Sequence, residues 1–223
     1  MKARKSASLS SRKQPRQARS SRMVGDILEA AAQVLVREGA QRFTTARVAE
    51  RAGISVGSLY QYFPNKEAIL FRLQAEEWQQ TGRLVHGLLD DRSRPPAERL
   101  RSVVKAFFRS ECEEAALRMA LSDAVPLYRD ADETREHRLA SRQRFRAFMR
   151  EALPETGAAD RLRAADVVLM SMSAIGKSIS EDGRSPAEVD RMAEATSDMF
   201  CAWFDRLAAR THLLPDRRPP AGS

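Results

Sequence analysis

The sequence predicts an all-α fold with a small N-terminal helical domain and a larger C-terminal one. Apolar residues recur three or four positions apart over most of the 223-residue chain, as on one face of a helix. No segment shows the sustained alternation of a half-buried strand. Capping residues, glycines and prolines mark where the helices start and stop. We expect a basic arm over residues 1–22, a helix-turn-helix domain over 23–70, a second domain over 71–212 and a disordered tail over 213–223.

Residues 1–22 form a basic arm that we expect to be disordered. The arm has eight Lys or Arg residues, no acid, and only Met1 and Leu9 as bulky hydrophobic residues, so it cannot pack. It accounts for the whole formal net charge of +8. Such an arm is either a solvated tail or an electrostatic contact to a polyanion, since cations near phosphates release counterions. Composition leaves both interpretations open.

The remaining composition argues against several classes of protein. Cys112 and Cys201 lie far apart and form no C-x-x-C pair, and the three histidines show no ligand spacing. We therefore expect no disulfide framework, no metal site and no cofactor, which fits the reducing cytoplasm. No apolar run approaches the roughly 18 residues needed to cross a bilayer, so no membrane partner is expected.

Two helices are expected before residue 54. The first has an apolar face that starts at Met23 and ends at Gly39. The second is short, is capped by Thr44 or Thr45, and stops at Gly53.

The next helix overlaps a motif of serine hydrolases. Residues 53–57 match G-x-S-x-G, in which Ser55 would be the nucleophile. That motif requires a strand before the serine, whereas the residues before Gly53 have a helical pattern. Ser55 is better explained as the cap of a helix over residues 56–62, which Pro64 closes. A serine hydrolase that uses Ser55 remains the distant alternative; otherwise we expect no catalytic residue and no enzyme.

Two short helices joined by a tight turn form a helix-turn-helix unit, whose second helix fits a DNA major groove. Gly57 would let the backbone approach DNA closely, and Gln61 can pair with an adenine edge. The hydroxyls of Tyr60 and Tyr62 can bond phosphate oxygens; the alternative is that both rings only pack the domain. Lys66 lies in the first turn of a fourth helix, where it can anchor a phosphate.

Residues at fixed spacing over 23–70 form one extended pattern. Its members are Phe43-Thr44-Thr45, Val48-Ala49, Ala52-Gly53-Ile54-Ser55, Gly57-Ser58-Leu59-Tyr60, Tyr62-Phe63 and Asn65-Lys66-Glu67. This pattern resembles the TetR/AcrR family of bacterial transcription regulators. The resemblance implies an all-α homodimer with a three-helix DNA-binding domain. It also implies a larger C-terminal domain that binds an effector and supplies the dimer interface.

The resemblance also assigns DNA contacts, residue by residue. Position 46, where some members of the family place a base-reading arginine, is Ala46 here, whereas the adjacent Arg47 can reach a phosphate. The family's phosphate contacts fall on Thr45, Tyr60, Tyr62 and Lys66, and its base-reading positions on Val56, Gly57, Ser58 and Gln61. Thr44, Arg47 and Ser55 complete the expected DNA-binding site.

Four further helical regions are expected over residues 97–124, 131–152, 159–181 and 186–212, after a break at 91–96. Ser185 and Glu188 form a capping box that starts the last one. By resemblance, the last two helices pair with their symmetry mates in a four-helix bundle; the alternative is that they pack only within one subunit. The expected dimer interface consists of Leu169, Met172, Ile175, Ile179, Met192, Thr196, Met199, Phe200 and Trp203.

The resemblance places an effector cavity among the middle helices, where aromatic and Met side chains would suit a small, largely hydrophobic ligand. His86 and Tyr128 could orient such a ligand. The alternative is that the same stripe is ordinary core. The expected ligand-binding residues are Trp78, His86, Phe107, Phe108, Cys112, Met119, Tyr128, Phe145, Phe148 and Met149.

From the sequence we therefore expect a cytoplasmic, homodimeric repressor that binds a palindromic double-stranded DNA operator and is released by a small effector. The alternatives are an effector-independent activator and an architectural DNA-binding protein.

Overall fold

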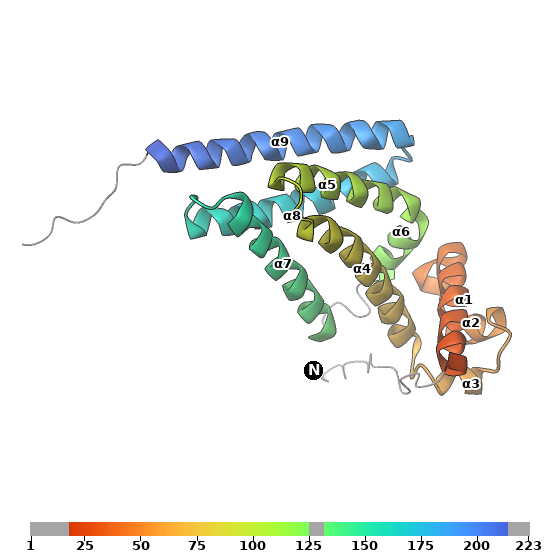
Figure 1. Cartoon of the computed structure of the whole chain (residues 1–223). Coiled ribbons are helices and arrows are strands. Elements are labelled where there is room, and N and C mark those ends of the chain that lie inside the picture. Colours follow the sequence, from red (N-terminus) through yellow and green to blue (C-terminus); the bar gives the residue numbers. More distant parts are fainter. Residues whose placement is uncertain (1–17, 125–131, 214–223) are drawn as a thin grey trace, which may run out of the picture. The chain divides into compact units, whose positions relative to one another are not determined.

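The computed structural model describes residues 18–124 and 132–213 (Figure 1). All regular secondary structure in these two ranges is α-helical, which confirms the predicted fold class. Across the same ranges, no helix combines the length and the apolar character that a membrane crossing requires.

The N-terminal helices are α1 (Ala18–Arg42), α2 (Thr45–Arg51), α3 (Val56–Tyr60) and α4 (Lys66–Asp90). Gly39 interrupts α1 with φ 75° and ψ 168°, so the regular helix ends where the sequence predicts. Because α1 begins at Ala18, residues 18–22 of the expected basic arm are helical, and the rest of the arm lies outside the described residues. Helix α3 is two residues shorter than predicted, since Gln61 already acts as its C-cap.

The C-terminal helices are α5 (Pro96–Glu113), α6 (Ala115–Ala124), α7 (Asp132–Ala152), α8 (Ala158–Glu181) and α9 (Pro186–Leu213). The helical region predicted over 97–124 is divided into α5 and α6, because the helix is interrupted at Glu114. The capping box before α9 is confirmed: the backbone N–H of Ser185 donates to Glu188 Oε2 at 2.9 Å.

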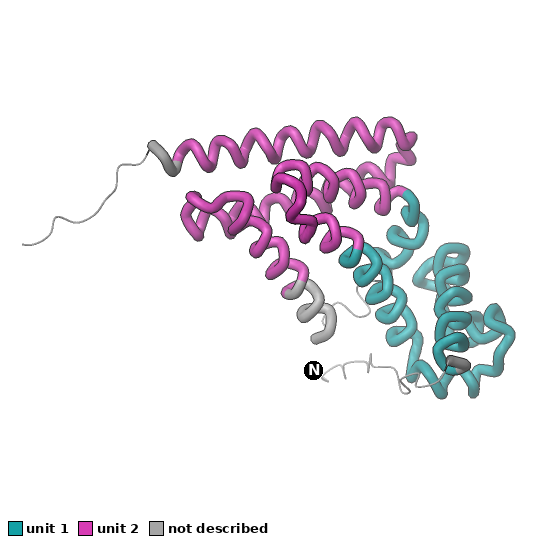
Figure 2. The backbone as a smooth tube through the Cα atoms, viewed as in Figure 1, with its two compact units in different colours: residues 1–83, 113–138 teal, residues 84–112, 139–223 magenta. Residues whose placement is uncertain are grey.

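The helices form two compact units, which Figure 2 shows in different colours. The first unit comprises residues 1–83 and 113–138, and the second comprises 84–112 and 139–223. Helix α4 therefore begins in the first unit and ends in the second. Helix α6 packs with α1 in the first unit, although its residue numbers fall within the expected C-terminal domain.

The core of the first unit surrounds α1. Ile27 and Leu35 of α1 are fully buried against the short helices, and Leu121 of α6 completes the cluster. An ion pair also fixes α6 to the first half of α4, because Arg118 contacts the buried carboxylate of Glu77. Arg118 Nη2 further donates to the hydroxyl of Thr81 at 3.0 Å. Both apolar packing and this ion pair thus hold α6 in the first unit.

The core of the second unit is built from the end of α4 and from α5, α7, α8 and α9. Gly176 lets α8 approach α5 closely, because a Cβ at this position would lie 3.0 Å from Phe107 Cε1.

Ion pairs on the surface of this unit join α5 to α9. The carboxylate of Asp190 contacts Arg109 at 2.6 Å and Lys105 at 3.0 Å. Its hydrogen bond to Arg109, followed by that to Lys105, lowers the pKa of Asp190 to about 2.

Candidate functional site

Helix α2 and the turn after it are fixed by local interactions. Thr44 is the N-cap, since its hydroxyl accepts from the backbone N–H of Arg47 at 3.3 Å. Val48 and Ala49 are buried against the first core. Gly53 adopts φ 67° after the helix, a conformation that glycine reaches without strain. The sequence prediction of a short capped helix followed by a tight turn is confirmed.

Ser55 has the structural role that the sequence favours. Its Oγ accepts from the backbone N–H of Ser58 at 3.0 Å and lies 2.9 Å from Ser58 Oγ, so it caps α3. The segment before Gly53 is helix α2 rather than a strand, so the structural context of a nucleophile elbow is missing here. The fully buried Leu59 anchors the inner side of α3.

The outer side of α3 is exposed. Val56, Gly57, Tyr60 and Gln61 all lie on the surface, and Ser58 is half-buried. A Cβ on Gly57 would meet no atom within 4 Å except Ser55 Oγ at 3.8 Å, so the space outside this backbone is open. Three of the four predicted base-reading positions, all except Ser58, therefore have the accessibility that base reading requires.

Two predicted phosphate contacts lie next to each other. The hydroxyls of Thr45 and Tyr60 are 3.1 Å apart, although the residues belong to different helices. Each hydroxyl has one proton to donate, and only one of the two is used between them. The pair can therefore donate the other proton to an anion such as a phosphate oxygen.

The other predicted contacts belong to the first unit as well. Arg47 forms an ion pair with Glu38 and donates to the carbonyl of Arg42 at 3.3 Å, so it braces α2 against α1. Tyr62 is half-buried against the first core. Lys66 is half-buried in the first turn of α4. Asn65 caps that helix by accepting from the backbone N–H of Ala68 at 2.8 Å.

The predicted ligand-binding residues that the structure describes are divided between the two units. Phe108, Phe145, Phe148 and Met149 are buried in the second core, with Phe107 and Cys112 packed against it. Trp78 and the exposed Met119 belong to the first unit, and Tyr128 lies outside the described residues. His86 and Phe148 line a cavity of about 100 Å³ in the second unit. Its other lining residues are Leu89, Asp90, Arg92, Arg144, Ala147 and Glu151.

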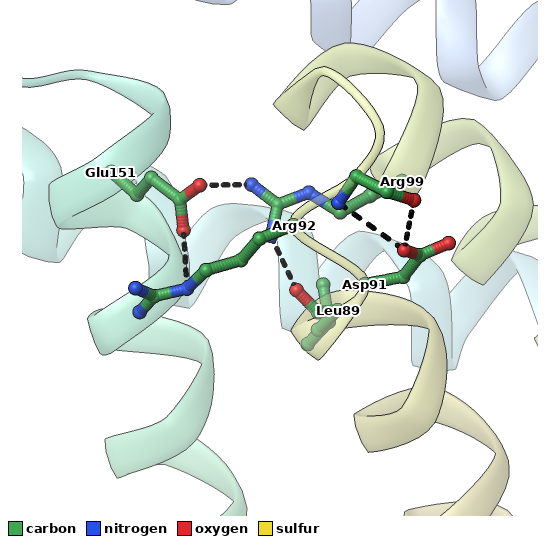
Figure 3. Close-up of polar contacts among 6 residues, drawn as sticks. Leu89, Asp91, Arg92, Arg99 and Glu151 are labelled. Carbon is green, nitrogen blue, oxygen red and sulfur yellow. Dashed lines mark hydrogen bonds and ion pairs between the residues drawn. The ribbon is translucent and has the colours of Figure 1, made fainter.

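A buried arginine beside this cavity was missed by the sequence analysis. Arg99 is only 1% exposed, and its guanidinium donates to the carbonyl of Leu89 at 2.6 Å and to Glu151 Oε1. It also lies over the ring of Phe148, 5.4 Å from the centroid. Figure 3 shows that Glu151 offers its second carboxylate oxygen to Arg92. The available signal was the position of Arg99 one turn before Val103, on the buried face of α5.

Comparison with known proteins finds two family models along this chain. The model described as bacterial regulatory proteins, tetR family, matches residues 27–73. The model described as tetracyclin repressor-like, C-terminal domain, matches residues 95–207, which is half of the chain. The chain belongs to the TetR family.

A curated relative supports this assignment. The HTH-type transcriptional repressor KstR of Rhodococcus jostii (strain RHA1) is 27% identical over 147 residues. The match covers 64% of this chain and spans only 65% of the length of that relative. The part of the chain that matches the tetR-family model contains the helix-turn-helix described above.

Solved structures with the same fold include two named regulators. FadR from Bacillus halodurans, a fatty acid degradation regulator, is 16% identical, with a TM-score of 0.62 over 84% of this chain and 96% of that one. The TetR-family regulator PfmR from Thermus thermophilus is 20% identical, with a TM-score of 0.64 over 78% and 96% of the two chains. At these identities the likeness establishes the fold alone.

The expected dimer-interface residues of this TetR-family chain divide by burial. Met172, Ile179, Thr196 and Phe200 are buried in the core of the single chain, as the intrasubunit alternative predicts for them. Met199 is 52% exposed. Leu169, Ile175, Met192 and Trp203 are half-buried at the edge of the core. Met170 of α8, which is not among the expected interface residues, is 68% exposed.

Proposed function

We propose that this TetR-family regulator is a repressor that binds a palindromic DNA operator as a homodimer and acts in the cytoplasm. The observation that carries the proposal is the exposed side of α3 together with the hydroxyl pair of Thr45 and Tyr60. An exposed helix face of this kind suits a major groove, and adjacent hydroxyls suit the phosphates beside it. KstR, the curated relative, is itself named as a repressor.

Dimer formation follows from what one helix-turn-helix can read. A single recognition helix reads a few base pairs, whereas a two-fold dimer reads two half-sites about one turn of DNA apart. Met170 and Val167 of α8 and Met199 of α9 are exposed apolar side chains that a partner subunit would cover. We therefore place the dimer contact on the outer faces of α8 and α9 rather than on their buried stripes.

Release by a small, largely hydrophobic effector completes the proposal. A ligand that prefers a conformation unsuited to the operator must weaken DNA binding by its differential affinity for the two states. The second unit supplies the buried aromatic residues that such a ligand would contact, among them Phe145 and Phe148.

Selection from random duplex DNA with the purified protein tests the proposal. The expected result is enrichment of a two-fold symmetric site of roughly 15–20 base pairs. Retention without an enriched motif would favour an architectural protein, and no retention by protein freed of small molecules would overturn the proposal. A reporter gene whose promoter carries the selected site then separates the two signs of regulation: its expression falls if the protein is a repressor and rises if it is an activator.

Two variants then test the assigned surface on the selected site. Tyr60→Phe removes one hydroxyl. It is expected to lower the affinity for every DNA sequence by about tenfold, the value of a hydrogen bond to a charged group. Gln61→Ala is expected to relax base preference at one position in each half-site. Gln79→Ala, an exposed glutamine on α4, is the matched control and should change neither property.

A further inference from the structure

We propose that the cavity between the end of α4 and α7 binds the anionic group, a carboxylate or a phosphate, of a small organic molecule. Its lining comes from His86, Leu89 and Asp90 of α4, Arg92 after it, and four residues of α7. All of these residues belong to the second unit. The further step, that this molecule is the effector, rests on the proposed function.

The size of the cavity suits a head group. Its volume is about 100 Å³, several times the roughly 10–15 Å³ that a cavity needs to hold one water. A carboxylate or phosphate with a few neighbouring atoms fits, whereas a large ligand would have to extend beyond it. Leu89, Ala147 and Phe148 offer apolar contacts for such neighbouring atoms.

The lining holds two arginines and two acids, and the buried Arg99, which pairs with one of these acids, leaves an excess of one positive charge that favours an anion. Glu151 is compensated by the buried Arg99, with which it forms a close ion pair. The second carboxylate oxygen of Glu151 lies 3.9 Å from Arg92 Nε, which is too long for a hydrogen bond. The cation of Arg92 is therefore only weakly engaged by the protein.

Arg144 of α7 is likewise only weakly engaged by an acid. Its Nη1 lies 3.9 Å from Asp90 Oδ2, again beyond hydrogen-bond distance. Two guanidinium groups, whose side chains are 84% and 59% exposed, thus line one small cavity together with the exposed carboxylate of Asp90. The guanidinium fork matches carboxylates and phosphates and forms charge-assisted hydrogen bonds to both.

Thermal unfolding of the full chain without DNA tests the site. The probes are sodium phosphate, sodium benzoate and sodium chloride at equal ionic strength, with benzyl alcohol as the uncharged analogue of benzoate. A ligand that binds only the folded protein raises the unfolding midpoint with its concentration. We expect a saturable rise with phosphate or benzoate that chloride and benzyl alcohol do not give.

Two arginine variants locate the effect. Arg144→Gln should raise the half-saturating concentration by about tenfold or more, since it removes a charge-assisted contact. Arg142→Gln is the matched control: Arg142 is exposed on the same helix but does not line the cavity. A rise with phosphate alone identifies a phosphate site, and a rise with benzoate alone identifies a carboxylate site. Equal rises in chloride, or an unchanged response in Arg144→Gln, would overturn the proposal.

The effector step has a separate readout. Operator binding is measured with and without the anion that raised the midpoint. Loss of operator affinity in the wild type but not in Arg144→Gln identifies the cavity as an effector site. Unchanged operator affinity would refute the effector step and leave the anion site standing. Failure to bind any operator would refute the proposed function, while the thermal measurements without DNA would still decide the site.

Discussion

Glu151→Ala is expected to destabilise the second unit by about 3 kcal/mol, more than removal of the arginine that it neutralises. Arg99 is 1% exposed, and without Glu151 its guanidinium keeps the carbonyl of Leu89 as its hydrogen-bond acceptor. Leaving a buried charge uncompensated costs about 3–5 kcal/mol. The side chain of Glu151 is 39% exposed, so water can enter after truncation and the cost should lie at the lower end.

Arg99→Met should cost only about 1–2 kcal/mol. Methionine fills much of the same space and removes the buried charge altogether. Glu151 then remains at the surface near Arg92, where its charge is solvated. The remaining cost is that of the Leu89 carbonyl, which loses its donor at the end of α4. The two partners of one ion pair therefore differ in their mutational effect.

The two tryptophans allow this difference to be measured. Trp78 lies in the first unit and Trp203 in the second, so in a Trp78→Phe background the fluorescence of Trp203 reports the second unit. Urea unfolding at one fixed protein concentration gives the free energy of unfolding, since that concentration affects a dimer. Glu155→Ala, at an exposed glutamate after α7, is the control. A cost for Arg99→Met equal to or above that for Glu151→Ala would refute the reasoning.

Three further predictions concern stability. Leu59→Ala should cost the first unit about 2–5 kcal/mol, since the side chain is fully buried; an unchanged urea midpoint in Trp78 fluorescence would contradict this. The lowered pKa of Asp190, about 2 against 3.8, contributes stability that is complete above pH 4 and is lost as the pH falls towards 2. Asp190→Asn should therefore flatten acid unfolding in that window, followed by circular dichroism. Gly176→Ala should destabilise the second unit despite better helix propensity, whereas Gly87→Ala, which meets no atom within 4 Å, should stabilise it by about 0.4–1 kcal/mol in urea.

Local signals made the DNA-binding helices predictable. The caps at Thr44 and Ser55 act within three residues, and the turn at Gly53 depends on the conformation of one residue. Such features are set by neighbours in the sequence, so a single sequence is enough to find them.

Features that depend on distant residues were not predictable in this way. Arg99 is buried because Glu151, 52 positions later, neutralises it. The break at Glu114 lies between two segments that both read as helix, and it reflects the packing of α6 on α1. The exposed Met170 lies one position from Leu169 of the expected interface, and periodicity alone did not show which of them faces the core.

The position of α6 sets a rule for building chimaeras from this protein. The first unit is interrupted in the sequence, because residues 84–112 belong to the second unit before the chain returns in α6. A graft that joins the DNA-binding end of this chain to a foreign sensor after α4 would discard Leu121 and Arg118. The transplanted DNA-binding helices would then expose part of the apolar face of α1, and Glu77 would lose its arginine partner. A workable donor fragment must therefore include α6 together with the DNA-binding helices.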